Sequence, residues 1–424
     1  MKNINTTQLK DFLGKEVTCK GWIYNFRSSG KLYFLQFRDG AGFIQAIADK
    51  SLIPDDLKIE ASVELTGKVA KHPKKEEYEL QVSACQIIQN PKQDYPISKK
   101  DHGPEFLLDH RHLWLRSRQQ WAILRLRHLV KVAFCEFFNK QGFIELDTPA
   151  FTANACEGTT DLFEVDYFDR KAYLSQNGQL YLEAMCMAFG KVYDLCPSFR
   201  AEKSKTRKHL TEFWSLNPEI AFCEHEQSLK IQEESIKYML QYVLQHGLIE
   251  LTILERDVAQ LQKTIDTPFL HYEYPAAIKE LQARGSKIKY NEDLGADEED
   301  LLTRDSDAVV VVKNWPKNIK PFYMKGHPQD KTRVLNVDIL APRGFSEIVG
   351  GSQREDDYEI LLANIKKAGL NLADFEWYLD LRRYGSVPHC GFGIGIERMT
   401  RWVSGIHHIR ETIPFPRLIN RLKP

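Results

Sequence analysis

One stretch of the sequence concentrates cationic side chains beside an aromatic ring. Residues 200–214 read Arg-Ala-Glu-Lys-Ser-Lys-Thr-Arg-Lys-His-Leu-Thr-Glu-Phe-Trp, with five Lys or Arg residues between positions 200 and 208. An arginine offers a planar fork for phosphate oxygens, and Phe213 offers a face on which a purine can stack. The stretch therefore suits a nucleoside polyphosphate, although a solvated charged hairpin has the same composition.

Two carboxylates further along the chain could hold a cation next to such a ligand. Asp338 lies in the apolar run Asn-Val-Asp-Ile-Leu at 336–340, and Glu347 opens Glu-Ile-Val-Gly-Gly-Ser-Gln-Arg at 347–354. Carboxylates on neighbouring strands bind hard cations through oxygen, as Mg²⁺ bound to ATP requires. A lone Asp/Glu pair is more often structural, so the argument depends on the presence of three such clusters in one domain.

A glycine-rich run completes the set. Residues 391–395 read Gly-Phe-Gly-Ile-Gly and are followed by Glu397 and Arg398. The sequence lacks both the phosphate-binding loop G-x-x-x-x-G-K-[ST] and the dinucleotide fingerprint G-x-G-x-x-G. The run alone is equally typical of a closely packed strand-to-helix junction, but Arg398 at the start of a helix could reach a phosphate.

The elements that must position these residues fall into two parts. Residues 1 to about 90 hold roughly five short β-rich runs, near 17–24, 31–38, 43–48, 61–69 and 78–88, separated by turns such as Gly40-Ala41-Gly42. Five such strands are typical of an OB-fold β-barrel, which often binds single-stranded nucleic acid, although an SH3-like module gives a similar pattern. We predict a β domain over 1–92 and a hinge over 93–117.

The remainder, 118–424, has mixed α and β character. Apolar residues recur at helical spacing from Arg118 to the glycine at 142 and again over 224–246. A strand–loop–strand is expected over 197–222, further strands near 309–312 and 333–340, and helices over 356–369 and 395–405. The predicted fold class is α+β.

Composition narrows the function classes. Lys plus Arg equals Asp plus Glu, 58 against 58, which excludes a globally polybasic nucleic-acid or membrane-surface binder. Positive charge is nevertheless in local excess, since residues 1–100 hold 16 Lys or Arg against 12 Asp or Glu. No run of 18 apolar residues occurs, and the eight cysteines form no C-x-x-C pair, so we expect a cytoplasmic protein with reduced thiols and no membrane partner.

These motifs together resemble the class II aminoacyl-tRNA synthetases of the aspartyl/asparaginyl/lysyl subgroup, and most closely the asparaginyl enzymes. The resemblance covers essentially the whole chain. Three ordered motifs carry it, at 142–149, at 199–214 and at 393–398, with flanking runs at 378–385 and 413–417. It implies an OB-fold anticodon-binding domain followed by an antiparallel-sheet catalytic domain flanked by helices, which works as a homodimer with ATP and Mg²⁺.

The resemblance also implies roles for individual residues. Arg200 would bridge the α-phosphate and the attacking carboxylate and is the candidate catalytic residue. The ATP-binding set is Arg200, Glu202, Arg207, His209, Phe213, Glu347 and Arg398, with Asp338 and Glu347 holding the metal. The amino-acid-binding set is Glu157, Gln179, Asn217 and Arg354, and the anticodon set is Arg27, Phe34 and Gln45. On spacing alone, Phe34 would more often belong to the core.

Two features bear on the amino acid. Leu182 lies where similar aspartyl enzymes carry a lysine that meets the substrate carboxylate, which favours a neutral amide. Asn217, however, lies where asparaginyl enzymes typically have Glu, and Asn177 where Ser is usual, so discrimination against aspartate should be softer.

The implied activity is ligation of asparagine to tRNA(Asn) through an aminoacyl-adenylate. Two alternatives remain open. One is a paralogue that uses adenylate chemistry for aspartate charging or amidation, and the N-terminal β domain argues against amidation. The other is a non-catalytic tRNA-binding regulator, against which Arg200, Glu202, Glu347 and Arg398 argue.

Overall fold

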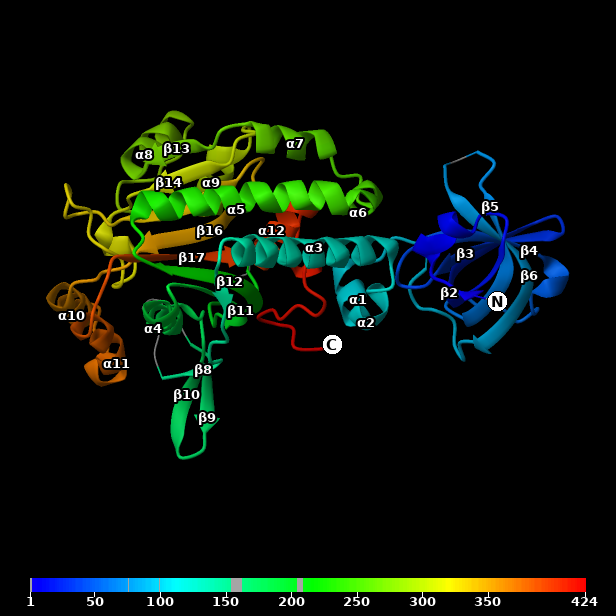
Figure 1. The fold of residues 1–424 in the computed structure, drawn as a ribbon, viewed down its shortest axis with the longest axis horizontal. Coiled ribbons are helices and arrows are strands. Elements are labelled where there is room, and N and C mark those ends of the chain that lie inside the picture. The colour runs from blue at the N-terminus through cyan, green and yellow to red at the C-terminus, as the bar shows by residue number, and fades with distance from the viewer. Residues whose placement is uncertain (1, 75, 99, 154–161, 204–208) are drawn as a thin grey trace. The chain divides into compact units, whose positions relative to one another are not determined.

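The structure, a computed structural model, describes residues 2–74, 76–98, 100–153, 162–203 and 209–424. It divides into two compact units, Met1–Leu107 and Leu108–Pro424 (Figure 1). Among the residues that the structure describes, no helix is both long and apolar enough to cross a membrane.

The first unit is a sheet closed on itself. Its strand order is β1-β2-β3-β4-β6-β5, and β2 also pairs with β5, which closes the sheet. The strands are β1 (Lys2–Asn3), β2 (Glu16–Ser29), β3 (Leu32–Arg38), β4 (Phe43–Asp49), β5 (Ser62–Lys71) and β6 (Tyr78–Gln89), with short 3₁₀ turns η1 (Thr6–Phe12) and η2 (Lys50–Leu52).

Alternation along the strands builds the core of this unit. Val17, Cys19 and Ile23 in β2 are fully buried, and Leu35 and Phe37 in β3 face the same interior. The 14-residue strand β2 contributes to three pairings, antiparallel with β3 and β5 and parallel with the short β1. The five expected β-rich runs correspond to β2 through β6, and the OB-fold architecture is confirmed.

The second unit is built on an eight-stranded sheet. Its order is β13-β14-β15-β16-β17-β12-β11-β7, antiparallel except at the β7–β11 and β13–β14 pairs. The strands are β7 (Ile144–Glu145), β11 (Lys191–Phe199), β12 (Glu212–Ala221), β13 (Leu270–Glu273), β14 (Val310–Lys313), β15 (Asn336–Ala341), β16 (Ser346–Gln353) and β17 (His389–Gly395). A separate small sheet, visible at the bottom of Figure 1, joins β8 (Phe151–Thr152), β10 (Arg170–Leu174) and β9 (Glu164–Tyr167).

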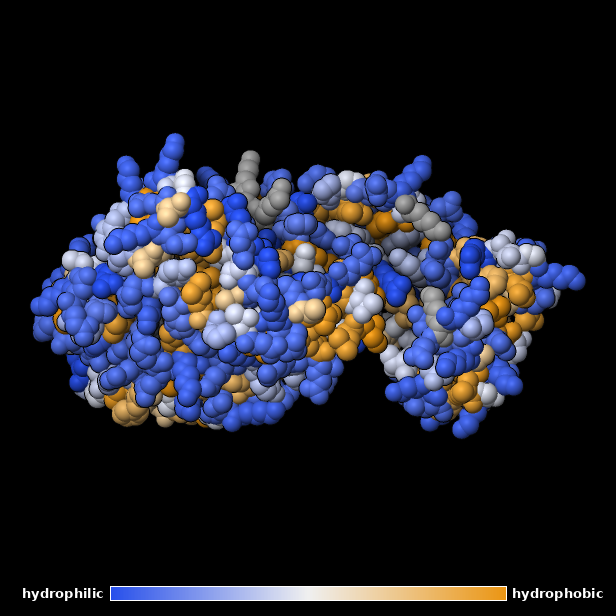
Figure 2. Space-filling model, turned by 90° about the horizontal axis from the view of Figure 1, so that it is seen from above, coloured by the Kyte–Doolittle hydropathy of each residue, from blue (hydrophilic) through white to orange (hydrophobic). Residues whose placement is uncertain are grey.

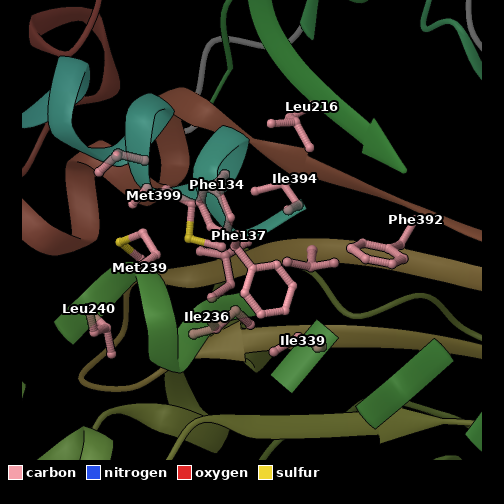
Figure 3. Close-up of a cluster of buried hydrophobic side chains, with 14 of the residues drawn as sticks. Phe134, Phe137, Leu216, Ile236, Met239, Leu240, Ile339, Phe392, Ile394 and Met399 are labelled. Atoms are coloured by element: carbon pink, nitrogen blue, oxygen red, sulfur yellow. The ribbon is translucent and has the colours of Figure 1, made fainter. Parts of the chain in front are cut away.

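Two long helices cover one face of the large sheet. In Figure 1, α3 (Arg118–Lys140) and α5 (His225–His246) run side by side across it. Phe134 and Phe137 of α3 meet Ile236 and Met239 of α5 over sheet residues such as Ile339 (Figure 3). Burying each such side chain stabilises the fold by about 1.5–3 kcal/mol. This packing holds the central strands, and therefore the side chains on their other face, in fixed positions.

Shorter helices surround the sheet. They are α1 (Pro104–Asp109), α2 (Arg111–Trp114), α4 (Gln179–Phe189), α6 (Leu248–Ile253), α7 (Val258–Asp266), α8 (Tyr274–Ala283), α9 (Ala296–Thr303), α10 (Tyr358–Lys367), α11 (Leu372–Arg383) and α12 (Ile396–Ser404), with 3₁₀ turns η3 (Lys317–Ile319) and η4 (Ile409–Glu411). Hydrophilic residues dominate the face of this unit seen in Figure 2, with apolar residues between them. The α+β class and a sheet flanked by helices are confirmed, although the sheet is mixed rather than wholly antiparallel because the β7–β11 and β13–β14 pairs are parallel.

Candidate active site

A cavity of about 330 Å³ opens over the middle strands of the large sheet. Residues predicted from different parts of the sequence line it together: Gln179, Arg200, His209, Phe213, Asn217, Asp338, Glu347, Arg354 and Arg398. Glu202 is not among the lining residues, and Glu157 and Arg207 lie outside the described residues. The fold thus gathers nine of the predicted residues into one site.

The β11–β12 hairpin positions the first guanidinium. Ser198 pairs with Phe213 in the register, and the N–H of Arg200, just past the end of β11, donates to the carbonyl of Thr211 at 3.0 Å. The Arg200 guanidinium lies 5.5 Å from the centre of the Phe213 ring. The guanidinium of Arg200 and the ring of Phe213 therefore line the cavity next to one another.

A second guanidinium enters from the junction between β17 and α12. Gly395 ends the strand and caps the helix, so the glycine-rich run is a strand-to-helix junction that also lines the cavity. Buried Glu397 fixes this junction, since it pairs with Arg127 at 2.7 Å and accepts from the N–H of Trp214 at 3.0 Å. The adjacent Arg398 donates from Nη1 to Glu347 Oε2 at 2.8 Å.

The two carboxylates of the predicted metal site converge over a glycine. A Cβ on Gly350 would lie 3.0 Å from Glu347 Oε1 and 3.7 Å from Asp338 Oδ1. The other oxygens are already engaged, Oε2 of Glu347 by Arg398 and Oδ2 of Asp338 by Lys320 at 2.7 Å. Two oxygens that face the same small space are the donor set a hard cation prefers, so these residues fit Mg²⁺.

Burial and neighbouring cations shift the pKa values of these two carboxyls in opposite directions. Burial raises the pKa of Asp338 to about 7, with Lys320 opposing the shift and Glu347 adding to it. Burial also acts on Glu347, but the Arg398 guanidinium holds the pKa of that carboxyl below its usual value. Two partly buried carboxylates that repel one another favour a bound cation.

A buried ion pair forms another part of the lining. Arg354 donates from Nε and Nη2 to Glu219 at 3.0 and 2.9 Å, and from Nη1 to Ser352 Oγ at 2.7 Å. Both partners are almost fully buried. Three of the five N–H groups of the guanidinium are thereby used, and two remain for a ligand. Burial opposes the charged form of Arg354, but Glu219 raises its pKa.

Behind this pair lies a fully buried carboxylate network. Glu183 accepts from Arg382 at 2.7 Å, from Tyr378 at 2.7 and 2.8 Å and from Gln179 at 3.2 Å, and its Oε2 lies 3.0 Å from His389 Nε2. Burial raises the pKa of Glu183, but the charge of Arg382 outweighs it and holds the pKa below its usual range.

The same network resembles a metal site by composition only. Within the described parts of the chain, Glu183, Glu219 and His389 form one group whose ligand atoms lie within 4.8 Å of one another. Arg382 and Arg354 already bind its two carboxylates. Guanidinium groups occupy the positions a cation would need, so we regard the group as a structural charge network.

Asn217 reaches the cavity from β12, and a carboxylate lies behind it. Its Nδ2 donates to Asp194 Oδ1 at 2.7 Å and to Ser215 Oγ at 3.0 Å. The Thr148 hydroxyl donates to the other oxygen of Asp194 at 2.5 Å. Burial raises the pKa of Asp194, while these hydrogen bonds act against the rise.

In the first unit, the three predicted anticodon residues share one face of the sheet. Phe34 pairs in register with Arg27, whose guanidinium lies 5.1 Å from the Phe34 ring, while Gln45 on β4 donates to Glu79 at 3.1 Å. Leu35 and Phe37 point to the opposite face, into the core. Phe34 is half-buried and is not part of that core, contrary to what spacing alone favours.

Sequence reasoning missed several residues that shape the cavity. Lys320, Glu219 and Asp194 carry charge at or behind its lining. Lys320 lies in an irregular segment next to η3, and the other two lie within strands, where an isolated acid gives no motif. Only pairing across the sheet reveals their partners.

Comparisons with known proteins identify a family for each part of the chain. Residues 103–419 match the family described as tRNA synthetases class II (D, K and N), and residues 17–88 match the OB-fold nucleic acid binding domain. The fold and the matched family define a class II aminoacyl-tRNA synthetase. The chain belongs to the subgroup of that class described by the letters D, K and N.

The solved structures similar to this chain include asparaginyl- and aspartyl-tRNA synthetases. An asparaginyl-tRNA synthetase from Pyrococcus horikoshii complexed with asparaginyl-adenylate is 41% identical, with a TM-score of 0.95 and 100% of each chain covered. An Entamoeba histolytica asparaginyl-tRNA synthetase in complex with asparaginyl-adenylate is 31% identical, with a TM-score of 0.91 and coverage of 100% and 99%. An aspartyl-tRNA synthetase from Entamoeba histolytica is 26% identical, with a TM-score of 0.83 and coverage of 100% and 93%. The chain is thus similar over its full length to asparaginyl-tRNA synthetases, which are ligases.

Proposed function

We propose that this protein ligates asparagine to tRNA(Asn) in two steps, through an asparaginyl-adenylate made from ATP. The proposal depends on one cavity that brings the expected ATP ligands together with the expected amino-acid ligands. The former are Arg200, Phe213 and Arg398, and the latter include Arg354 and Asn217. Two similar full-length proteins are complexed with asparaginyl-adenylate, which supports the same intermediate here.

In the first step the asparagine carboxylate attacks the α-phosphorus of ATP and pyrophosphate leaves. Bringing two anions together is the main barrier, so Arg200 aligns the carboxylate with the α-phosphate and stabilises the charge that develops. Phe213 stacks on the adenine, Arg398 covers its other face and the γ-phosphate, and His209 and Arg207 bind the outer phosphates. Glu202 contacts the adenine.

A magnesium ion held by Asp338 and Glu347 would neutralise charge on the leaving pyrophosphate. Their converging oxygens over Gly350 support this assignment. Lys320 and Arg398 hold the outer oxygens of the two carboxylates, so the inner oxygens are fixed in direction.

Charge balance around Arg354 supports a neutral substrate side chain. The buried network contains two guanidiniums, Arg354 and Arg382, and two carboxylates, Glu183 and Glu219. An aspartate side chain would add an unbalanced negative charge, whereas an amide would not. Arg354 then donates its remaining N–H groups to the amide oxygen, while Gln179 and Glu157 bind the α-amino group.

The second step transfers the acyl group to the terminal ribose of the tRNA. We assign residues 1–92 as the anticodon-binding domain, with Phe34 stacking on a base and Arg27 and Gln45 contacting base edges. Residues 93–117 form the hinge, and 118–424 form the catalytic domain. We expect the protein to act in the cytoplasm.

A homodimer completes the proposal. Ile144 on the edge strand β7, Phe189 at the end of α4 and Phe222 after β12 are apolar and 45%, 55% and 79% exposed. Residues 142–149 belong to the motif that lies at the dimer interface in similar enzymes. A second copy of the chain would cover these side chains.

The proposed function is tested by ATP–pyrophosphate exchange with asparagine and with aspartate as alternative substrates. We expect asparagine to support exchange with a much higher kcat/KM than aspartate. Equal or reversed support would contradict the amide assignment and favour aspartate charging, for which the uncharged Asn217 leaves room.

A further inference from the structure

The side-chain amide of Asn217 can present either a hydrogen-bond acceptor or a donor to the substrate. Its carbonyl oxygen can accept from a substrate amide, which selects asparagine, or its NH₂ group can donate to a substrate carboxylate, which admits aspartate. A 180° turn of the amide exchanges the two. The selectivity of the site therefore depends on what fixes the direction of this side chain.

Asp194 fixes it from behind. An ionised carboxylate has acceptors only, so the group of Asn217 that lies 2.7 Å from Asp194 Oδ1 is the donor Nδ2. Ser215 contacts the same Nδ2 at 3.0 Å, but its hydroxyl can donate as well as accept and so fixes no direction. Asp194 is only 1% exposed, which removes water as a competing partner.

The opposite end of the amide points into the cavity. A Cβ on Gly393 would lie 3.1 Å from Asn217 Oδ1, and both residues line the site. Gly393 has no side chain to cover that oxygen. Oδ1 is therefore directed to the space in which the substrate side chain is expected.

The carboxylate is itself held in place. Thr148 donates to Asp194 Oδ2 at 2.5 Å, and a Cβ on Gly178 would overlap that oxygen. Gly178 caps α4 directly before Gln179, a proposed ligand of the α-amino group. The direction of Asn217 is thus tied to the element that binds the other end of the substrate.

From this geometry we infer that Asp194 is a positioning residue for substrate selection: it turns the carbonyl oxygen of Asn217 toward the substrate amide and supplies the negative charge that Asn217 lacks. A substrate carboxylate then meets an acceptor oxygen with a carboxylate behind it, and both disfavour aspartate. This inference rests on the proposed function, because it assumes asparagine as the substrate.

The test compares variants in ATP–pyrophosphate exchange with both amino acids. Asp194→Asn removes the acceptor-only partner and frees the Asn217 amide to turn. We expect the ratio of kcat/KM for asparagine over aspartate to fall about tenfold or more, mainly through KM, with the KM for ATP unchanged. Ser215→Ala is the matched control, since it removes a hydrogen bond to the same amide but leaves its direction fixed, and it should keep the wild-type ratio.

Exchanging the pair separates positioning from folding. The double variant Asp194→Asn with Asn217→Asp places the carboxylate at the cavity and the amide behind it, so it should recover the preference for asparagine lost in Asp194→Asn. Melting curves check that each variant is folded. A preference that Asp194→Asn leaves intact, an equal loss for both amino acids, or a double variant without recovery would overturn the role of Asp194. A wild-type enzyme without any preference for asparagine would instead contradict the proposed function itself.

Discussion

Individual arginine side chains in the cavity are held in fixed orientations by hydrogen bonds to neighbouring residues. Arg398 is held by Glu347, and Arg354 is held by Glu219 and Ser352. A guanidinium that is already oriented loses little entropy when it binds an anion and needs no rearrangement in the transition state. Arg200 is placed by the backbone of the β11–β12 hairpin and by its position beside Phe213.

Arg200→Ala tests the proposed catalytic role of this guanidinium. Removing the charge that aligns the two anions should lower the rate of pyrophosphate exchange by about 10²- to 10³-fold, the usual effect of losing one preorganised electrostatic group. Binding of tRNA should be unchanged in a filter-binding assay. Lys263→Ala, which removes an exposed cation paired with Asp307, is the control and should keep full exchange. Exchange that survives in Arg200→Ala would refute the role of this residue.

At the scale of the element, strand β17 shows how a missing side chain creates a site. A Cβ on Gly391 would overlap Glu219 Oε2 and come within 2.5 Å of Arg354 Nη2. The glycine therefore allows the buried ion pair to lie flat against the strand. Its neighbours Phe392 and Ile394 pack into the core on the other face, so the strand cannot shift to make room.

Gly391→Ala should therefore displace the Arg354–Glu219 pair. We expect kcat/KM for the amino acid to fall about 10- to 100-fold, since small misplacements of a substrate-binding group are costly, with a smaller change in the KM for ATP. Steady-state exchange kinetics over both substrates measure this. Gly326→Ala, where a Cβ would meet nothing within 4 Å, is the control. Equal effects of the two substitutions would contradict the steric argument.

Helix α5 begins with a buried histidine that should make stability depend on pH. Burial lowers the pKa of His225 from 6.5 to about 4, with Lys313 adding to the shift and Glu226 opposing it. Its Nε2 is buried without a hydrogen-bond partner among the described residues. His225 is protonated near pH 6.5 in the unfolded chain but only near pH 4 in the folded chain. Its contribution to the free energy of unfolding is therefore complete above pH 6.5 and is lost as the pH falls toward 4.

We therefore expect the free energy of unfolding to fall less between pH 7 and pH 4 in His225→Phe than in the wild type. The difference should approach about 3 kcal/mol, which is the full pKa shift converted at about 1.4 kcal/mol per pH unit. Urea unfolding at the two pH values measures it, and the comparison cancels the contribution of other groups. Parallel pH dependences in the two proteins would show that His225 is protonated while folded.

The sequence predicts elements well where one periodicity dominates. The helices at 118–140 and 225–246 and the strands of the first unit carry clear apolar spacing, and the structure confirms them. Strand β16 is harder to predict because Gly350 and Gly351 interrupt its apolar pattern, yet it pairs with β15 and β17 in the middle of the sheet. Helices α7, α8 and α9 were not predicted, since short amphipathic runs between loops give a weak signal.

The residues of the candidate site also differ in how well the sequence predicts them. Motifs with several neighbouring residues, such as 200–214 and 393–398, point to the cavity from sequence alone, and their described lining residues meet there. Asp194, Glu219 and Lys320 are single charged residues whose partners are distant in the chain. Their importance follows from pairing across strands, which a sequence without its fold does not show.

At the scale of the whole molecule, two separate cores carry the two parts of the proposed reaction. The unit Met1–Leu107 has its own closed sheet and apolar interior, and Leu108–Pro424 contains the cavity. The zero net charge is a sum over these parts, since the first 100 residues carry a surplus of four positive charges, 16 minus 12. A change confined to the nucleic-acid face should therefore leave adenylate formation untouched.

Phe34→Ala tests that separation. Loss of a stacking platform worth about 1–3 kcal/mol should raise the KM for tRNA about tenfold or more, while pyrophosphate exchange stays at the wild-type rate. Because Phe34 lies outside the core of its unit, the melting temperature should change little. Ile88→Ala, at a position 58% exposed on β6, is the control. Loss of both charging and exchange would indicate a structural role for Phe34.

Aminoacylation measured with both amino acids shows most directly whether the protein charges tRNA with asparagine, as proposed. The purified full-length protein is incubated with ATP, Mg²⁺, unfractionated tRNA and either labelled asparagine or labelled aspartate, and the acid-precipitable label is followed with time. We predict label on tRNA from asparagine, at a rate well above that from aspartate. Charging with aspartate at an equal or higher rate, or adenylate formation without any charged tRNA, would contradict the account.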